Sequence, residues 1–140
     1  MPEAQLEGQQ ALAQVEAAWN AAAGAWNVPA FAQVYAQDAV FFGGRPGHAV
    51  GRAAIADYFA SYAGVIESAA LTLTSQAVRA LADGVWLAQG YGAFEFVLAG
   101  GKPSRNVLRT TLVLVHREAR WQILQHHFSE SPGTPPLGDH

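Results

Sequence analysis

The stretch "RTTLVLVHREARWQILQHHFS", residues 109–129, decides the fold of this chain of 140 residues. Two runs in it, residues 109–116 and 121–129, are rich in Val, Leu, Thr and aromatic residues, as β-strands are. The connector "REAR" between them is short enough for a hairpin, so the two strands are predicted to pair antiparallel. The chain is therefore expected to end in a β-hairpin and a short tail.

The residues before this hairpin extend it into a sheet. The runs "ALTLTSQAVRAL" (70–81) and "VWLAQGYGAFEFVLA" (85–99) have the same composition and are separated by "ADG". We therefore predict four consecutive antiparallel strands. The short apolar run "AVFFGG" (39–44) predicts one further strand, which ends at two glycines and is followed by a Gly-rich loop.

The N-terminal part of the chain is predicted to be helical. Residues 3–25 are mostly Ala, Gln and Glu, with apolar side chains at three- and four-residue steps. Asn27 can cap a second, short helix that has Pro29 in its first turn and ends near Gln37. The apolar residues of "GRAAIADYFASYAG" (51–64) predict a third helix. Three helices before an antiparallel sheet form an α+β fold, with the helices on one face of a curved sheet.

Composition limits the function. The length and the apolar content of 51% suit a single domain, which we place at residues 1–131, with a mobile Pro- and Gly-rich tail at 132–140. A net charge of −3 with 8 Lys and Arg provides no basic stripe for nucleic acid, and no apolar run is long enough to span a membrane. The N-terminus is acidic where a signal peptide is basic, so the cytoplasm is the expected location.

The stretches "FAQVYAQDAVFF" and "GRAAIADYF", together with residues 109–129, resemble the nuclear transport factor 2-like superfamily. The spacing from Arg109 and Thr111 to Trp121 and His127 is similar to that of SnoaL-like (SgcJ/EcaC-type) bacterial proteins and of the calcium/calmodulin-dependent protein kinase II association domain. This resemblance implies a cone-shaped, cystatin-like α+β fold, in which three helices pack on a strongly curved antiparallel sheet and a cavity opens at the wide end. Members of the superfamily include isomerases, cyclases, dehydratases and epoxide hydrolases, whereas others only bind ligands or assemble into oligomers.

The alternation of side chains along the strands indicates which polar groups could line such a cavity. Arg109 interrupts an apolar series, so it is expected either to anchor a ligand carboxylate or enolate or to pair with Glu95. His127 could act as a general acid or base, or its ring could be hydrogen-bonded to a neighbouring strand. His126 should face the other way, toward solvent or a partner. Further candidates to line the cavity are Trp19, Tyr58, Tyr62, Trp86, Tyr91, Thr111 and Gln125.

Two functions follow from these patterns. The first is a homodimeric, cofactor-free domain that binds a small, partly apolar organic molecule, neutral or anionic, at a polar end formed by Arg109 and His127. Catalysis in such a domain would be acid/base isomerisation, dehydration or cyclisation. Both faces of the strand at 107–116 are apolar, so a partner subunit is expected to cover the sheet face that the helices leave open. No metal site is expected, since the adjacent side chains of "HH" diverge. The alternative is a non-catalytic association module, although Leu112 stands where the similar kinase domain has an arginine.

Overall fold

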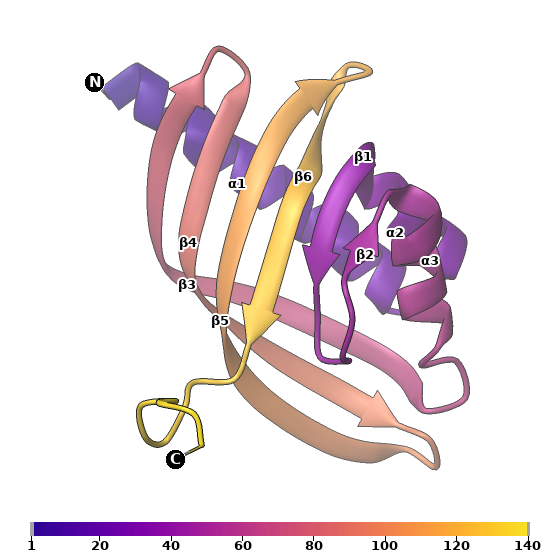
Figure 1. The fold of residues 1–140 in the computed structure, drawn as a ribbon. Coiled ribbons are helices and arrows are strands. Elements are labelled where there is room, and N and C mark those ends of the chain that lie inside the picture. The colour runs from indigo at the N-terminus through magenta and orange to yellow at the C-terminus, as the bar shows by residue number, and fades with distance from the viewer. Residues whose placement is uncertain (1, 140) are drawn as a thin grey trace.

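The computed structural model describes residues 2–139 and shows three helices and a single six-stranded sheet (Figure 1). In chain order the elements are α1 (Pro2–Ala23), α2 (Val28–Val34), β1 (Tyr35–Phe42), β2 (Ala49–Val50), α3 (Arg52–Ala60), β3 (Ile66–Ala82), β4 (Val85–Leu98), β5 (Lys102–Arg117) and β6 (Arg120–Ser129). The strand order is β2-β1-β6-β5-β4-β3. Neighbouring strands are antiparallel, except that β1 and β6 are parallel. The α+β prediction is confirmed, and β2 is a strand that the sequence did not suggest.

The start of α2 follows the predicted capping. The side chain of Asn27 accepts a hydrogen bond of 3.1 Å from the backbone N–H of Ala30, and Pro29 lies in the first turn. The helix ends at Val34 rather than near Gln37. The cause is tertiary, because Tyr35 already pairs with β6 as the first residue of β1.

The sheet is strongly curved, and a bulge in β3 contributes to the curvature (Figure 1). The pairing of β3 with β4 shifts register between Thr74 and Ala77, where Ser75 takes a positive φ of 52°. Gly90 of β4 lies against this bulge, and a Cβ there would stand 2.5 Å from the carbonyl oxygen of Ser75. Since a bulge increases the local twist, a residue without a side chain allows the two strands to stay in contact as they bend.

Helix α1 packs along β3, the edge strand of the sheet. The side-chain amide of Asn20 donates to the carbonyl of Leu71 (2.9 Å) and accepts from its N–H (2.6 Å). A carboxylate oxygen of Glu16 accepts from the N–H of Leu73 (2.7 Å). Side chains of the helix thus satisfy main-chain groups that an edge strand otherwise exposes.

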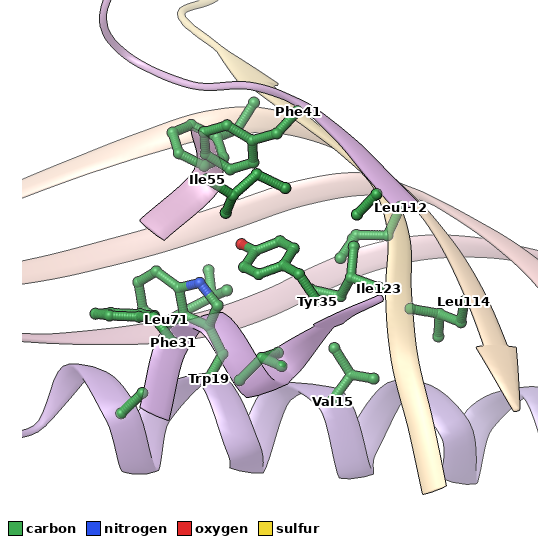
Figure 2. Close-up of a cluster of buried hydrophobic side chains, with 14 of the residues drawn as sticks. Val15, Trp19, Phe31, Tyr35, Phe41, Ile55, Leu71, Leu112, Leu114 and Ile123 are labelled. Atoms are coloured by element: carbon green, nitrogen blue, oxygen red, sulfur yellow. The ribbon is translucent and has the colours of Figure 1, made fainter. Parts of the chain in front are cut away.

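The core fills the space between the helices and the concave face of the sheet (Figure 2). Phe31 of α2 and Phe59 of α3 stack with their ring centroids 4.0 Å apart, and Trp19 of α1 meets both rings edge-on. Burying such a side chain stabilises the fold by about 1.5–3 kcal/mol. These aromatic contacts fix the three helices to one another above the sheet.

Candidate ligand cavity

The structure corrects the face that was expected to line the cavity. Leu108, Thr110 and Leu112 of β5 are buried on the concave side, whereas Arg109 is exposed on the opposite, convex side. The expected orientation of Arg109 into the cavity is therefore wrong. Its alternative pairing is wrong as well, because the residue near Glu95 is Arg105, at 3.9 Å.

A second bulge places the two histidines of β6 on the faces opposite to those that strict alternation predicts. Gln125 pairs with Val113, but the next pair joins Ile123 to Leu114, so Leu124 is an extra residue. One extra residue exchanges the two faces of a strand, so strict alternation along β6 fails. His126 therefore shares the interior with Ile123, and His127 is exposed.

A cavity of about 190 Å³ lies between the helices and the wide end of the concave face. Its lining contains no charged residue and consists of Trp19, Trp26, Gly44, Tyr58, Phe59, Tyr62, Ile66, Phe94, Phe96, Asn106, Leu108 and Phe128. Both tryptophans come from the region of α1, and both tyrosines from that of α3. This inner cavity is apolar, with the hydroxyls of the tyrosines and the amide of Asn106 as its principal polar groups.

Three of the residues predicted from the sequence line the inner cavity, namely Trp19, Tyr58 and Tyr62. The other predicted residues do not. Trp86 is buried elsewhere, where its indole N–H donates to Glu7 (2.8 Å). On the convex face, Tyr91 is exposed, Thr111 accepts a hydrogen bond from Gln89, and Gln125 pairs with Val113. On β5 the lining residues that the sequence did not predict, Asn106 and Leu108, alternate with the predicted Arg109 and Thr111.

The opening of the inner cavity is bounded by the loop after β1. The backbone N–H of Gly44 donates to the hydroxyl of Tyr58 at 2.9 Å. At Gly43 a Cβ would stand 2.5 Å from that hydroxyl, so only glycine permits this approach. Burial raises the pKa of Tyr58 and keeps its hydroxyl protonated.

A second, outer chamber of about 340 Å³ adjoins the inner cavity. The two spaces share four lining residues, Gly44, Asn106, Leu108 and Phe128. The outer chamber adds Gly43 and the two residues that end β6 and follow it, Ser129 and Glu130. The lining is therefore mostly apolar in the inner cavity and more polar in the outer chamber.

Beyond the inner cavity, a buried polar pair joins β1 to β6. The hydroxyl of Tyr35 lies 2.8 Å from Nδ1 of His126, and both side chains are fully buried. Burial, reinforced by the nearby His127, lowers the pKa of His126 to about 3, and burial raises the pKa of Tyr35. Nε1 of Trp19 lies beside the tyrosine hydroxyl without a well-aligned hydrogen bond (Figure 2).

The rings of Phe41 and Phe128 pack against His126, with centroids 5.7 and 5.0 Å away. His126 is not among the residues that line the inner cavity, whereas Phe128 is. The imidazole is therefore a neutral group beneath the cavity and does not form part of its wall.

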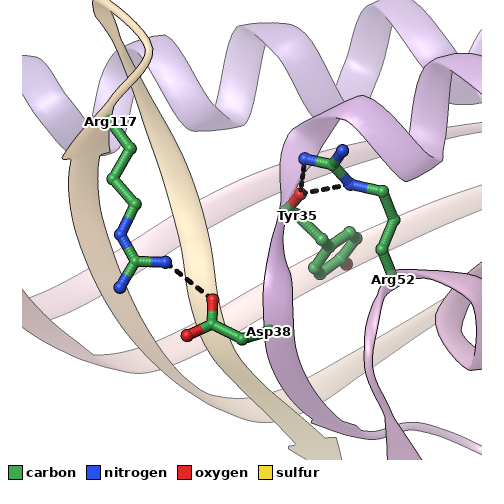
Figure 3. A network of polar contacts seen from close by, with 4 residues as sticks. All are labelled: Tyr35, Asp38, Arg52 and Arg117. Atoms are coloured by element: carbon green, nitrogen blue, oxygen red, sulfur yellow. Dashed lines mark hydrogen bonds and ion pairs between the residues drawn. The ribbon is translucent and has the colours of Figure 1, made fainter.

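Arginine side chains hold β1 from outside (Figure 3). The guanidinium of Arg52 donates two hydrogen bonds, of 3.0 and 2.8 Å, to the carbonyl oxygen of Tyr35. Arg117 of β5 forms a 2.6 Å ion pair with Asp38, and this hydrogen bond lowers the pKa of the carboxyl group. The Arg52 contact fixes the backbone from which the Tyr35 ring enters the core.

Within residues 2–139, no three His, Asp or Glu side chains are grouped so that they could hold a metal ion. None of the helices described combines the length and the hydropathy needed to cross a bilayer.

Comparisons with known proteins place the chain in a family. The family model of the SnoaL-like domain matches residues 12–133. No curated protein matches the chain significantly in sequence. Among solved structures, a Xanthomonas campestris protein described as a calcium/calmodulin dependent protein kinase II association domain is 27% identical, with a TM-score of 0.78 over 88% of this chain and 87% of that one.

Two more distant structures have the same fold. A nuclear transport factor 2-like superfamily protein from Salmonella enterica is 17% identical, with a TM-score of 0.75 over 96% of this chain and 99% of the other. A Novosphingobium aromaticivorans protein described as a scytalone dehydratase is 9% identical, with a TM-score of 0.75 over 100% and 99%. Since the family model spans most of the sequence, and the architecture agrees, the chain belongs to the SnoaL-like family and has the nuclear transport factor 2-like fold.

Proposed function

We propose that this protein binds a compact organic molecule whose single apolar ring occupies the inner cavity. The observation that carries the proposal is an aromatic-lined space of about 190 Å³ without a charged residue in its wall. An engineered apolar cavity of about 150 Å³ is large enough for benzene. A fused multi-ring ligand such as a steroid is larger than the inner cavity.

The polar groups in the wall suit recognition better than proton transfer. Tyr58 presents a hydroxyl and Asn106 an amide, which can orient a ligand by hydrogen bonds. Neither a carboxylate nor an imidazole lies in the inner wall, and the neutral His126 lies behind Phe128. Binding is therefore the activity that we assign to the inner cavity, although a structural neighbour is described as a dehydratase.

The test uses toluene, p-cresol and benzyl alcohol as ligands, with a four-ring steroid as the oversized comparison. A ligand present at about 100 times its Kd stabilises a protein by about 2.7 kcal/mol, which a thermal unfolding curve resolves. We expect the one-ring compounds to raise Tm and the steroid to have no effect. Leu108→Trp should fill the inner cavity and abolish the shift, while Val107→Trp, on the convex face of the same strand, should preserve it. Unchanged Tm with every one-ring compound would refute the proposal.

We further propose that two copies of the chain pair through the convex face of the sheet. This face exposes three large side chains of β4 and β5, Tyr91 (45%), Val107 (44%) and Val97 (37%). A neighbour described as an association domain, at 27% identity, supports the same proposal. Pairing and ligand binding use opposite faces of the sheet, so both can belong to one protein.

A further inference from the structure

We infer that the outer chamber selects ring compounds that carry a positively charged substituent, with Glu130 as the residue that selects them. This inference rests on the proposed binding of the ring in the inner cavity. Beyond that proposal, the ligand is expected to be cationic, and Glu130 is expected to bind its charged group.

The outer chamber continues the inner cavity. Asn106, Leu108 and Phe128 line both spaces, so a ligand with its ring inside can extend a substituent past these residues. Glu130 follows Phe128 by two residues and comes directly after the end of β6. Ser129, between them, lines the outer chamber as well, so the end of β6 and the residue that follows it together form this wall.

The charge of the outer chamber is negative. Glu130 is the only ionisable residue in its lining, and this carboxylate forms no ion pair or hydrogen bond among the residues described. The basic residue of the loop after β1, Arg45, is engaged elsewhere. Its guanidinium donates to Oγ (2.7 Å) and to the carbonyl oxygen (3.1 Å) of Ser61 and stacks 4.1 Å from the centroid of the Tyr62 ring.

Arg109, the other arginine near the end of β6, does not offset the negative charge of the outer chamber. Arg109 pairs in register with Ser129, but it is exposed on the convex face, while Leu108 beside it faces the cavity. An ammonium group in the outer chamber would therefore meet an available carboxylate, and a ligand carboxylate would be repelled by it. Asn106 and Ser129 can share the hydrogen bonds of the ammonium group.

An arylalkylamine fits both spaces, with the ring inside and the ammonium group at Glu130. Three ligands with the same ring and almost the same size separate the charge from the shape: benzylamine, which is cationic at pH 7, benzyl alcohol, which is neutral, and benzoate, which is anionic. We expect benzylamine to bind about fivefold more tightly than benzyl alcohol, which is the upper range for an exposed ion pair. Benzoate should bind most weakly.

Isothermal titration calorimetry or ligand-observed NMR on the full chain measures these affinities. Glu130→Gln should remove the preference for benzylamine and leave the affinity for benzyl alcohol unchanged. Glu118→Gln, an exposed carboxylate in the turn between β5 and β6, is the matched control and should keep the preference. Raising the salt concentration should weaken benzylamine binding selectively, because it screens exposed charges.

The outcomes separate the two proposals. If benzyl alcohol binds but benzylamine binds no better, or if Glu130→Gln keeps the preference, the inference about Glu130 is refuted and the proposed function stands. Tighter binding of benzoate would refute it in the same way. If none of the three binds to folded protein, the proposed function itself fails.

Discussion

The hydroxyl of Tyr35 and Nδ1 of His126 share a hydrogen bond of 2.8 Å between two fully buried side chains. Tyr35→Phe removes the hydroxyl and leaves this nitrogen without a partner in the core. Leaving a buried polar atom unpaired costs about 1–3 kcal/mol, so we expect the free energy of unfolding in urea to fall by that amount. Tyr91→Phe, which removes an exposed hydroxyl, should change it by less than about 0.5 kcal/mol. Equal effects of the two variants would show that the buried bond adds nothing to stability.

The depressed pKa of His126 predicts that acid destabilises the fold. The group has a pKa of about 3 in the folded protein and about 6.5 when unfolded, so the unfolded chain binds a proton that the folded one excludes between these values. The contribution of a neutral His126 to the free energy of unfolding is present above pH 6.5 and is lost as the pH falls from there toward 3. Between pH 7 and pH 5 the loss from this one group is about 2 kcal/mol.

Urea unfolding at several pH values between 5 and 7.5 measures this loss. The window stays above the range in which Asp38, whose pKa is lowered by Arg117, begins to titrate. His126→Leu should flatten the pH dependence, even if the variant is less stable throughout. His127→Gln, which removes the exposed neighbour, should retain most of it. A slope that survives in His126→Leu would assign the effect to other groups.

Gly90→Ala should destabilise the protein by about 2 kcal/mol, because the new Cβ would stand 2.5 Å from the main-chain oxygen of Ser75 in the β3 bulge. A backbone atom cannot rotate away as a side chain can. Gly133→Ala is the matched control, since a Cβ there meets nothing within 4 Å. Thermal unfolding compares the two, and a Gly90→Ala variant as stable as the control would mean that the bulge shifts without cost.

Val107→Asp should convert the proposed dimer to a monomer, because it places a charge within an apolar interface. Size-exclusion chromatography with light scattering measures the mass of the wild-type chain and of the variant. Val65→Asp, at an exposed valine between α3 and β3, should leave the mass unchanged. A wild-type chain that runs as a monomer at every concentration would refute the pairing, and a ring of many chains would favour the association module.

The sequence predicted the order of the elements well, because that order depends on local signals. The cap at Asn27, the helical spacing before Gly64 and the short connector "REAR" each specify their element without distant contacts. The parallel pairing of β1 with β6 and the two-residue strand β2 depend on tertiary contacts that local patterns do not encode.

The candidate site was predicted less well. The aromatic residues on the helices, Trp19, Tyr58 and Tyr62, do line the cavity, since helical spacing identifies an inward stripe. On β5 both faces are apolar, so alternation alone could not decide between Leu108 and Arg109. On β6 the extra residue Leu124 exchanged the two faces, and nothing in the composition of the strand signals such a bulge.

The contacts between α1 and β3 limit how copies of this chain can assemble. Asn20 and Glu16 occupy main-chain positions that an added strand would need, and the opposite end of the sheet is a strand of only two residues. Neither end therefore offers a long template on which chains could add one after another. The proposed association through the convex face would use a surface that each chain has once and would close on itself in a symmetric pair. The same helix that completes the core thus hinders fibre growth by addition of strands at the β3 edge.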